Sequence, residues 1–244
     1  QRIFDHAQAV YWVGDIAWNR GDVAMTRESW TRYRDHGARL VALDPDREAW
    51  QTELGYGHRN LGVLSLEEGD ASAAIEAFTK ALGISRQLAA GHPDDSAARI
   101  VLADDLAWLA NAQMRFGAFA DAERTLAEEA AVHAGLLALD SADDSALQRQ
   151  AVNSRLQARL ALSTGAPERA LAILHGLEDL HRARLANEPD NRFWLACTAG
   201  CTSTRRMPTS SWVMSMSPAP GRATRSDSDD GWSRSMPRCT TGRS

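Results

Sequence analysis

Apolar residues recur along most of the chain at steps of three and four. Trp50, Leu54, Gly57, Leu61 and Leu64, for example, follow one another at these steps and line one stripe of a helix. Strict alternation of apolar and polar residues, which is typical of a strand, is absent from the first 194 residues. The spacing therefore predicts an all-α protein. The expected helices cover residues 3–19, 22–43, 46–67, 70–90, 94–116, 119–139, 143–163 and 167–187, and a further helix starts near residue 190.

A period of 48 residues organises these helices. Turn-like glycines stand 48 residues apart at Gly21, Gly69, Gly117 and Gly165. A small residue precedes each glycine by seven positions, and a bulky apolar residue follows it by nine. A second turn signal, usually proline, falls midway between the glycines. We call each set of equivalent positions a column. The small column is Gly14, Gly62, Ala110 and Ala158, and the bulky column is Trp30, Phe78, Leu126 and Leu174. The second turn column is Pro45, Pro93, Ser141 and Pro189. Each copy is expected to be a pair of helices of about 20 residues.

Acidic residues follow the second turn signal directly. Asp46, Asp94 and Asp190 stand where a carboxylate can cap the next helix and oppose its dipole. We therefore predict that these three residues are helix caps. Trp30 and Phe78, in the bulky column, are predicted to lie in the core.

The order of small residue, turn glycine, small residue, bulky residue and proline resembles the tetratricopeptide repeat. The second copy shows it most fully, as LGVLSLEEGDASAAIEAF followed by HPDD. The resemblance covers residues 3 to about 194 and is weaker near Thr26, Ser154 and Gln157. The family's usual period is about 34 residues, so each unit here carries about fourteen more. The resemblance implies an α-solenoid of antiparallel helix pairs, a TPR-like superhelix with about four repeats and the start of a fifth.

The repeats are expected to form one domain over residues 1–194. Its four units are residues 1–45, 46–93, 94–141 and 142–189. From residue 195 the periodicity ends and Ser, Thr, Arg, Pro and Gly dominate, so residues 195–244 are predicted to be a disordered tail. A native disordered terminus and an out-of-frame reading of a GC-rich gene both remain open as its origin. Because the chain starts with Gln1 instead of Met, we expect it to be a piece of a longer polypeptide.

The net charge of −5 is unevenly divided. Residues 195–244 contain seven Arg and three Asp, which gives +4 and leaves −9 on residues 1–194. An acidic body argues against nucleic acid as the main ligand, because phosphate binding needs a cationic face. No apolar run is long enough to suggest a membrane span. All three cysteines lie in the tail, and a thiol-free body favours a cytoplasmic location.

No residue pattern points to catalysis, a metal or a cofactor. Cys197 and Cys201 lack the second close pair that a structural zinc site needs. His175 and His181 are six residues apart, on opposite faces of a helix. The paired aspartates have no visible partner group for acid–base chemistry. We therefore expect a protein that is not an enzyme and that holds no cofactor.

In the tetratricopeptide family the first helix of each unit lines a concave groove. Matching positions carries this role to aromatic, amide and charged residues, the types that anchor peptide interfaces. They are Tyr11, Asp15, Trp18, Asn19, Tyr56, Arg59, Glu67, Asp104, Asn111, Arg115, Arg155, Arg159 and Ser163. A solvated helix face is the equal alternative. Under the groove hypothesis, alanine at Arg59, Arg115 and Arg159 weakens binding without unfolding the chain.

The leading functional hypothesis is a non-enzymatic protein–protein interaction module or scaffold. Its concave groove would bind a peptide or a protein domain. The alternative hypothesis is the regulatory or sensor region of a larger bacterial signalling protein. In that case a kinase, receptor-like or DNA-binding domain would lie upstream of Gln1.

Overall fold

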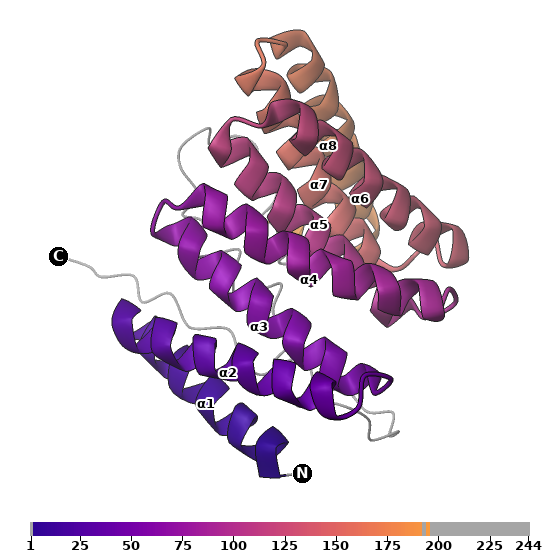
Figure 1. Cartoon of the computed structure of the whole chain (residues 1–244). Coiled ribbons are helices and arrows are strands. Elements are labelled where there is room, and N and C mark those ends of the chain that lie inside the picture. The colour runs from indigo at the N-terminus through magenta and orange to yellow at the C-terminus, as the bar shows by residue number, and fades with distance from the viewer. Residues whose placement is uncertain (1, 192–193, 196–244) are drawn as a thin grey trace, which may run out of the picture.

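The chain folds into a linear array of helices, each packed against the next along the sequence (Figure 1). A computed structural model describes residues 2–191 and 194–195, which contain no strand. The predicted tail from residue 196 onward lies outside these residues. The helices are α1 (Arg2–Asn19), α2 (Val23–Leu43), α3 (Glu48–Glu67), α4 (Ala71–Gly91), α5 (Ser96–Phe116), α6 (Phe119–Leu139), α7 (Asp144–Ser163) and α8 (Pro167–Asn187). The all-α, solenoid-like prediction is confirmed. None of the described helices is long and apolar enough to cross a membrane.

The four column glycines all form turns between helices. Gly21, Gly69, Gly117 and Gly165 have φ values of 74°, 86°, 86° and 75°. No atom would crowd a Cβ at any of them, so it is the left-handed backbone, and not a lack of space, that favours glycine. The N–H after each glycine bonds back into the preceding helix; that of Ala118, for example, reaches the Gln113 carbonyl at 2.9 Å. This pattern closes the helix end and reverses the chain.

The predicted caps at Asp46 and Asp94 are wrong by one residue. Each lies in a two-residue turn with the preceding proline, so the N-cap position falls on the next residue. Asp95 accepts a hydrogen bond from the Ala97 N–H at 2.8 Å, whereas Arg47 makes no side-chain cap. The same offset holds at Asp190, because it is Asn191 Oδ1 that accepts from the Trp194 N–H at 3.4 Å.

The small and bulky columns meet inside each helix pair. A Cβ at Gly14 would lie 2.4 Å from the Trp30 ring, and a Cβ at Gly62 would lie 2.7 Å from the Phe78 ring. Trp30 and Phe78 are buried, as predicted. In the third unit the bulky residue is Leu126, and its smaller side chain leaves room for an alanine opposite. Glycine thus accompanies an aromatic ring, and alanine accompanies leucine.

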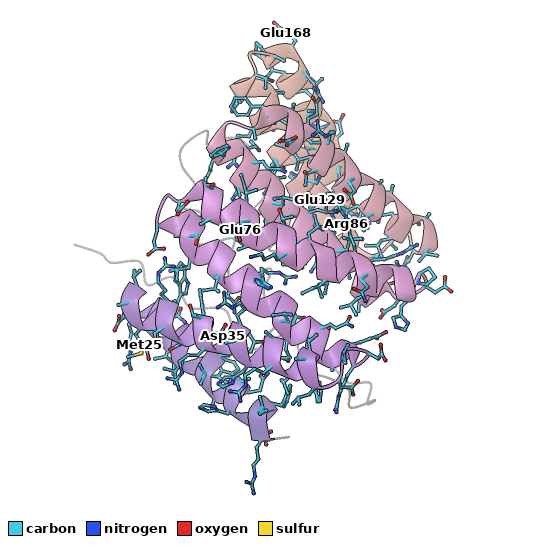
Figure 2. The ribbon with its side chains drawn as sticks, viewed as in Figure 1. Met25, Asp35, Glu76, Arg86, Glu129 and Glu168 are labelled. Carbon is cyan, nitrogen blue, oxygen red and sulfur yellow. The ribbon has the colours of Figure 1, made fainter. Side chains whose placement is uncertain are left out.

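The second helix of each unit also packs on the first helix of the next unit. Phe78 of α4 stacks on Trp108 of α5, with ring centroids 5.7 Å apart. Asn153 of α7 donates to the Leu126 carbonyl of α6 at 3.0 Å. Exposed ion pairs join successive second helices. Arg86 of α4 and Glu128 of α6, for example, lie 2.6 Å apart; Arg86 is labelled in Figure 2. These contacts link the units into one array.

Candidate functional site

The first helices of successive units are joined to one another by polar side chains. Each contact spans about one repeat in sequence, so α1, α3, α5 and α7 form a continuous layer. The contacts are Gln8 to Glu53 at 2.7 Å, Arg59 to Asp105 at 2.6 Å, Arg149 to Asp104 at 3.1 Å, Arg159 to Asn111 at 2.6 Å, and Arg115 to the Leu66 carbonyl at 2.7 Å. This layer contains the positions predicted to bind a partner.

Arg59 is a buried cation in this layer. Only 2% of its surface is exposed, and its Nε donates to Asp105 Oδ1 at 2.6 Å. Burial opposes the charge of Arg59, but Asp105 outweighs burial and raises the pKa of the guanidinium above its ordinary value. The guanidinium carbon lies 5.2 Å from the centre of the Tyr56 ring. Arg59 Nη1 is buried and has no hydrogen-bond partner among the described residues.

Asp104 lies beside this pair and is equally buried. Burial raises the pKa of its carboxyl, although Arg149 and Arg59 act in the opposite direction. Arg149 of α7 reaches Asp104 at 3.1 Å and is itself more exposed. Two adjacent aspartates on α5 therefore each bind an arginine from a different neighbouring first helix. Removing either arginine would leave a buried carboxylate without its cation, which is strongly destabilising.

A cavity of about 190 Å³ opens between α3, α4 and α5. Its lining includes the buried Arg59 and Asp105 and the exposed pair of His92 and Glu48, joined at 2.6 Å. The hydrogen bond that His92 donates to Glu48 raises the pKa of its imidazole. The remaining walls are largely apolar and include Ile84, Leu88 and Val101. Typical ligand pockets measure roughly 300–1,000 Å³, so this cavity suits a single side chain better than a large ligand.

Gly55 helps to open the cavity. The corresponding positions in the other three units hold alanine, as Ala7, Ala103 and Ala151, and all three are buried. A Cβ at Gly55 would meet only Ile84, at 3.6 Å, which is ordinary van der Waals contact. The missing methyl group therefore leaves space that no neighbouring side chain fills.

Several predicted groove residues are wholly or partly covered by neighbouring side chains. Tyr11 is buried in a cluster with Ala7, Val10 and Tyr33, and burial raises its pKa to about 12. Trp18 is half-buried and packs against the core, with its ring centroid 5.5 Å from that of Trp30. Asp104 is held by Arg149. Helix positions that face a neighbouring unit are covered when the units stack closely, and whether these residues contact a partner stays a prediction.

The other predicted residues divide by their accessibility. Tyr56 and Arg59 line the cavity. Asp15, Asn111 and Arg155 are partly buried, whereas Asn19, Glu67, Arg115, Arg159 and Ser163 are exposed. Because Arg59 is the buried partner of Asp105, its replacement by alanine would disturb the fold, contrary to the expectation that it alters binding alone.

Helix α4 contributes to this site in a way that the sequence pattern did not predict. Ile84 and Leu88 of α4, and His92 directly after its end, line the cavity, but the resemblance to the tetratricopeptide repeat places the groove on first helices only. The available signal was Gly55, a glycine in a helix where the other units carry alanine. Among residues 2–191 and 194–195, no group of three His, Cys, Asp or Glu side chains is placed to hold a metal ion.

Comparison with known proteins gives no further constraint on the site. No protein-family model matches the chain, and no curated protein matches it.

Proposed function

We propose that this chain is a non-enzymatic protein-interaction module of the tetratricopeptide type, which binds a peptide or an exposed protein segment. The partner lies along the layer of first helices and inserts one side chain between α3, α4 and α5. The observation that carries the proposal is the cavity beside Arg59.

The chemistry of the cavity selects the inserted side chain. Buried donors are nearly always satisfied in folded proteins, and Arg59 Nη1 has no acceptor among the described residues. A carboxylate or amide oxygen of the partner would supply one once the side chains that cover Nη1 move aside. The apolar walls formed by Ile84, Leu88 and Val101 would cover the methylene groups that carry this oxygen. Glutamate and glutamine combine both features.

Exposed cations extend the surface beyond the cavity. Arg115 and Arg159 lie on α5 and α7, the first helices that follow α3, and both are exposed. Arginine is enriched at the energetic centres of protein interfaces. A partner with further acidic residues would therefore contact these arginines after its anchor has entered the cavity.

A library of short random peptides displayed on phage tests the proposal. We expect selection on the full chain to enrich peptides with a glutamate or glutamine anchor. Filling the cavity by Gly55→Leu should weaken their binding by about tenfold or more. Gly83→Leu is the matched control, because Gly83 lies exposed on α4 with no atom near its Cβ position.

Circular dichroism shows whether each variant retains its helices. Gly55→Ala provides a smaller step if Gly55→Leu perturbs the fold. Equal binding by the Gly55 and Gly83 variants, or selected peptides without a shared anchor, would contradict the proposal.

A further inference from the structure

Helix α1 lies at one end of the array (Figure 1), and its outer stripe is apolar and exposed. We use this name for Ala9, Trp12 and Ile16, which lie three and four residues apart and so share one helix face. Trp12 and Ile16 are 46% and 50% exposed. The neighbouring Val13 is 49% exposed. Large apolar side chains grouped in this way on one face mark an interaction surface.

The internal repeat shows what these positions do in the other units. The counterparts of Ala9 and Ile16 are buried in α3, α5 and α7, and those of Trp12 are buried or half-buried. Trp108, for example, occupies the position of Trp12 and is only 8% exposed. The full columns are Gly57, Asp105 and Asn153; Asn60, Trp108 and Leu156; and Leu64, Ala112 and Leu160.

The second helix of the preceding unit covers each of these columns. A Cβ at Gly57 would lie 2.7 Å from the Arg34 backbone of α2. Trp108 stacks on Phe78 of α4 at 5.7 Å, and Asn153 bonds to the backbone of α6. The outer stripe of α1 thus continues the series of interfaces α2–α3, α4–α5 and α6–α7, and among the described residues no helix covers it.

We propose that the outer stripe of α1 binds an amphipathic helix of the α2, α4 and α6 type, with a bulky apolar side chain packed against Trp12. The bulky residue follows from the equivalence of Trp12 and Trp108, because Trp108 is covered by the bulky column at Phe78. Ala9 carries a Cβ, which at the equivalent Gly57 would lie 2.7 Å from the Arg34 backbone, so the bound helix must lie farther from α1 at this point than α2 lies from α3.

An added helix tests this surface in the full chain. A copy of residues 69–96 is placed directly before Gln1, which separates the copied Phe78 from Trp12 by the same 30 residues that separate Phe78 from Trp108. Ile16→Cys supplies a thiol in the outer stripe, and Cys197, Cys201 and Cys239 are changed to serine. The rate of reaction of this thiol with a disulfide reagent reports whether the stripe is covered.

We expect the added helix to slow this reaction by at least about tenfold, because the reagent then needs a local opening. The melting temperature of the chain should rise by roughly 5 °C. The control is the same extension with Phe78→Asp in the added copy only, which should leave the thiol reactive.

Three results would overturn the proposal. The thiol could react equally fast with and without the added helix. Its reaction in the unextended chain could slow as protein concentration rises, which would identify a second copy of the chain as the occupant. Deletion of residues 196–244 could speed the reaction, which would identify the tail as the occupant.

Discussion

Single residues decide how closely the helices of a pair approach. At Gly62 there is no room for a side chain, because Phe78 fills the space 2.7 Å from the Cβ position. In the third unit the same two positions hold Ala110 and Leu126, which pack in one cluster. The residue types at the two columns are therefore coupled, and one cannot be enlarged unless the other is reduced.

This coupling predicts a rescue. Gly62→Ala should destabilise the chain by about 1–3 kcal/mol through overpacking against Phe78. Combining it with Phe78→Leu recreates the pair found in the third unit. The double variant should be more stable than the sum of the two single changes by about 1 kcal/mol or more, measured by urea unfolding of all four proteins. Additive effects would mean that the two columns do not constrain each other.

His58 makes the stability of the chain depend on pH. Burial, together with Arg34 and Lys80, lowers the pKa of its imidazole to about 4. The unfolded chain takes up this proton near pH 6.5. Between these two values the unfolded state binds a proton that the folded state does not, so stability falls as pH falls. We expect His58→Gln to flatten the decline in urea midpoint between about pH 6.5 and pH 4. An unchanged slope in that window would show that other groups cause it.

Helix ends differ between the units in a way that can be tested. Asp22 and Asp70 cap α2 and α4, accepting from backbone N–H groups at 3.0 and 2.9 Å. The corresponding Ala118 has φ −80° and ψ 61°, close to the −86° and 76° of Asp70, but has no side chain to act as a cap. The backbone of α6 is thus already arranged for an aspartate that the sequence lacks.

Ala118→Asp should stabilise the chain by about 0.5–2 kcal/mol, since it satisfies an N–H of the first turn of α6. Ala120→Asp is the control, because it adds the same charge near the helix start away from the cap position. It should gain less, from the helix dipole alone. Thermal and urea unfolding compare the two. Equal gains would assign the effect to charge instead of capping.

The whole molecule is held together mainly by neighbours along the sequence, so damage should remain local. Phe78 packs against Trp108 and so links the second and third units. Phe78→Ala should cost roughly 3–5 kcal/mol at this junction. Hydrogen exchange should accelerate in α3, α4 and α5 and remain slow in α7 and α8, as expected for a linear array. Uniform acceleration through all helices would show instead that the array unfolds as one unit.

The sequence could predict the helices, their turns and the coupled columns of small and bulky residues, because the same helix pair recurs four times at a spacing of 48. Left-handed turns favour glycine wherever they occur, and a bulky residue needs a small one opposite it. The caps were displaced by one residue because the proline turn uses two residues, a length that the pattern does not reveal.

The candidate site was decided by the tertiary structure. Nothing in the spacing shows that Arg59 binds Asp105, that Tyr11 is buried, or that α4 supplies a wall of the cavity. These features depend on residues that differ from unit to unit and meet only when helices from two units stack. The period determines which positions face each other. The volumes and charges of the particular side chains determine whether a contact between two units becomes core, an ion pair or a cavity.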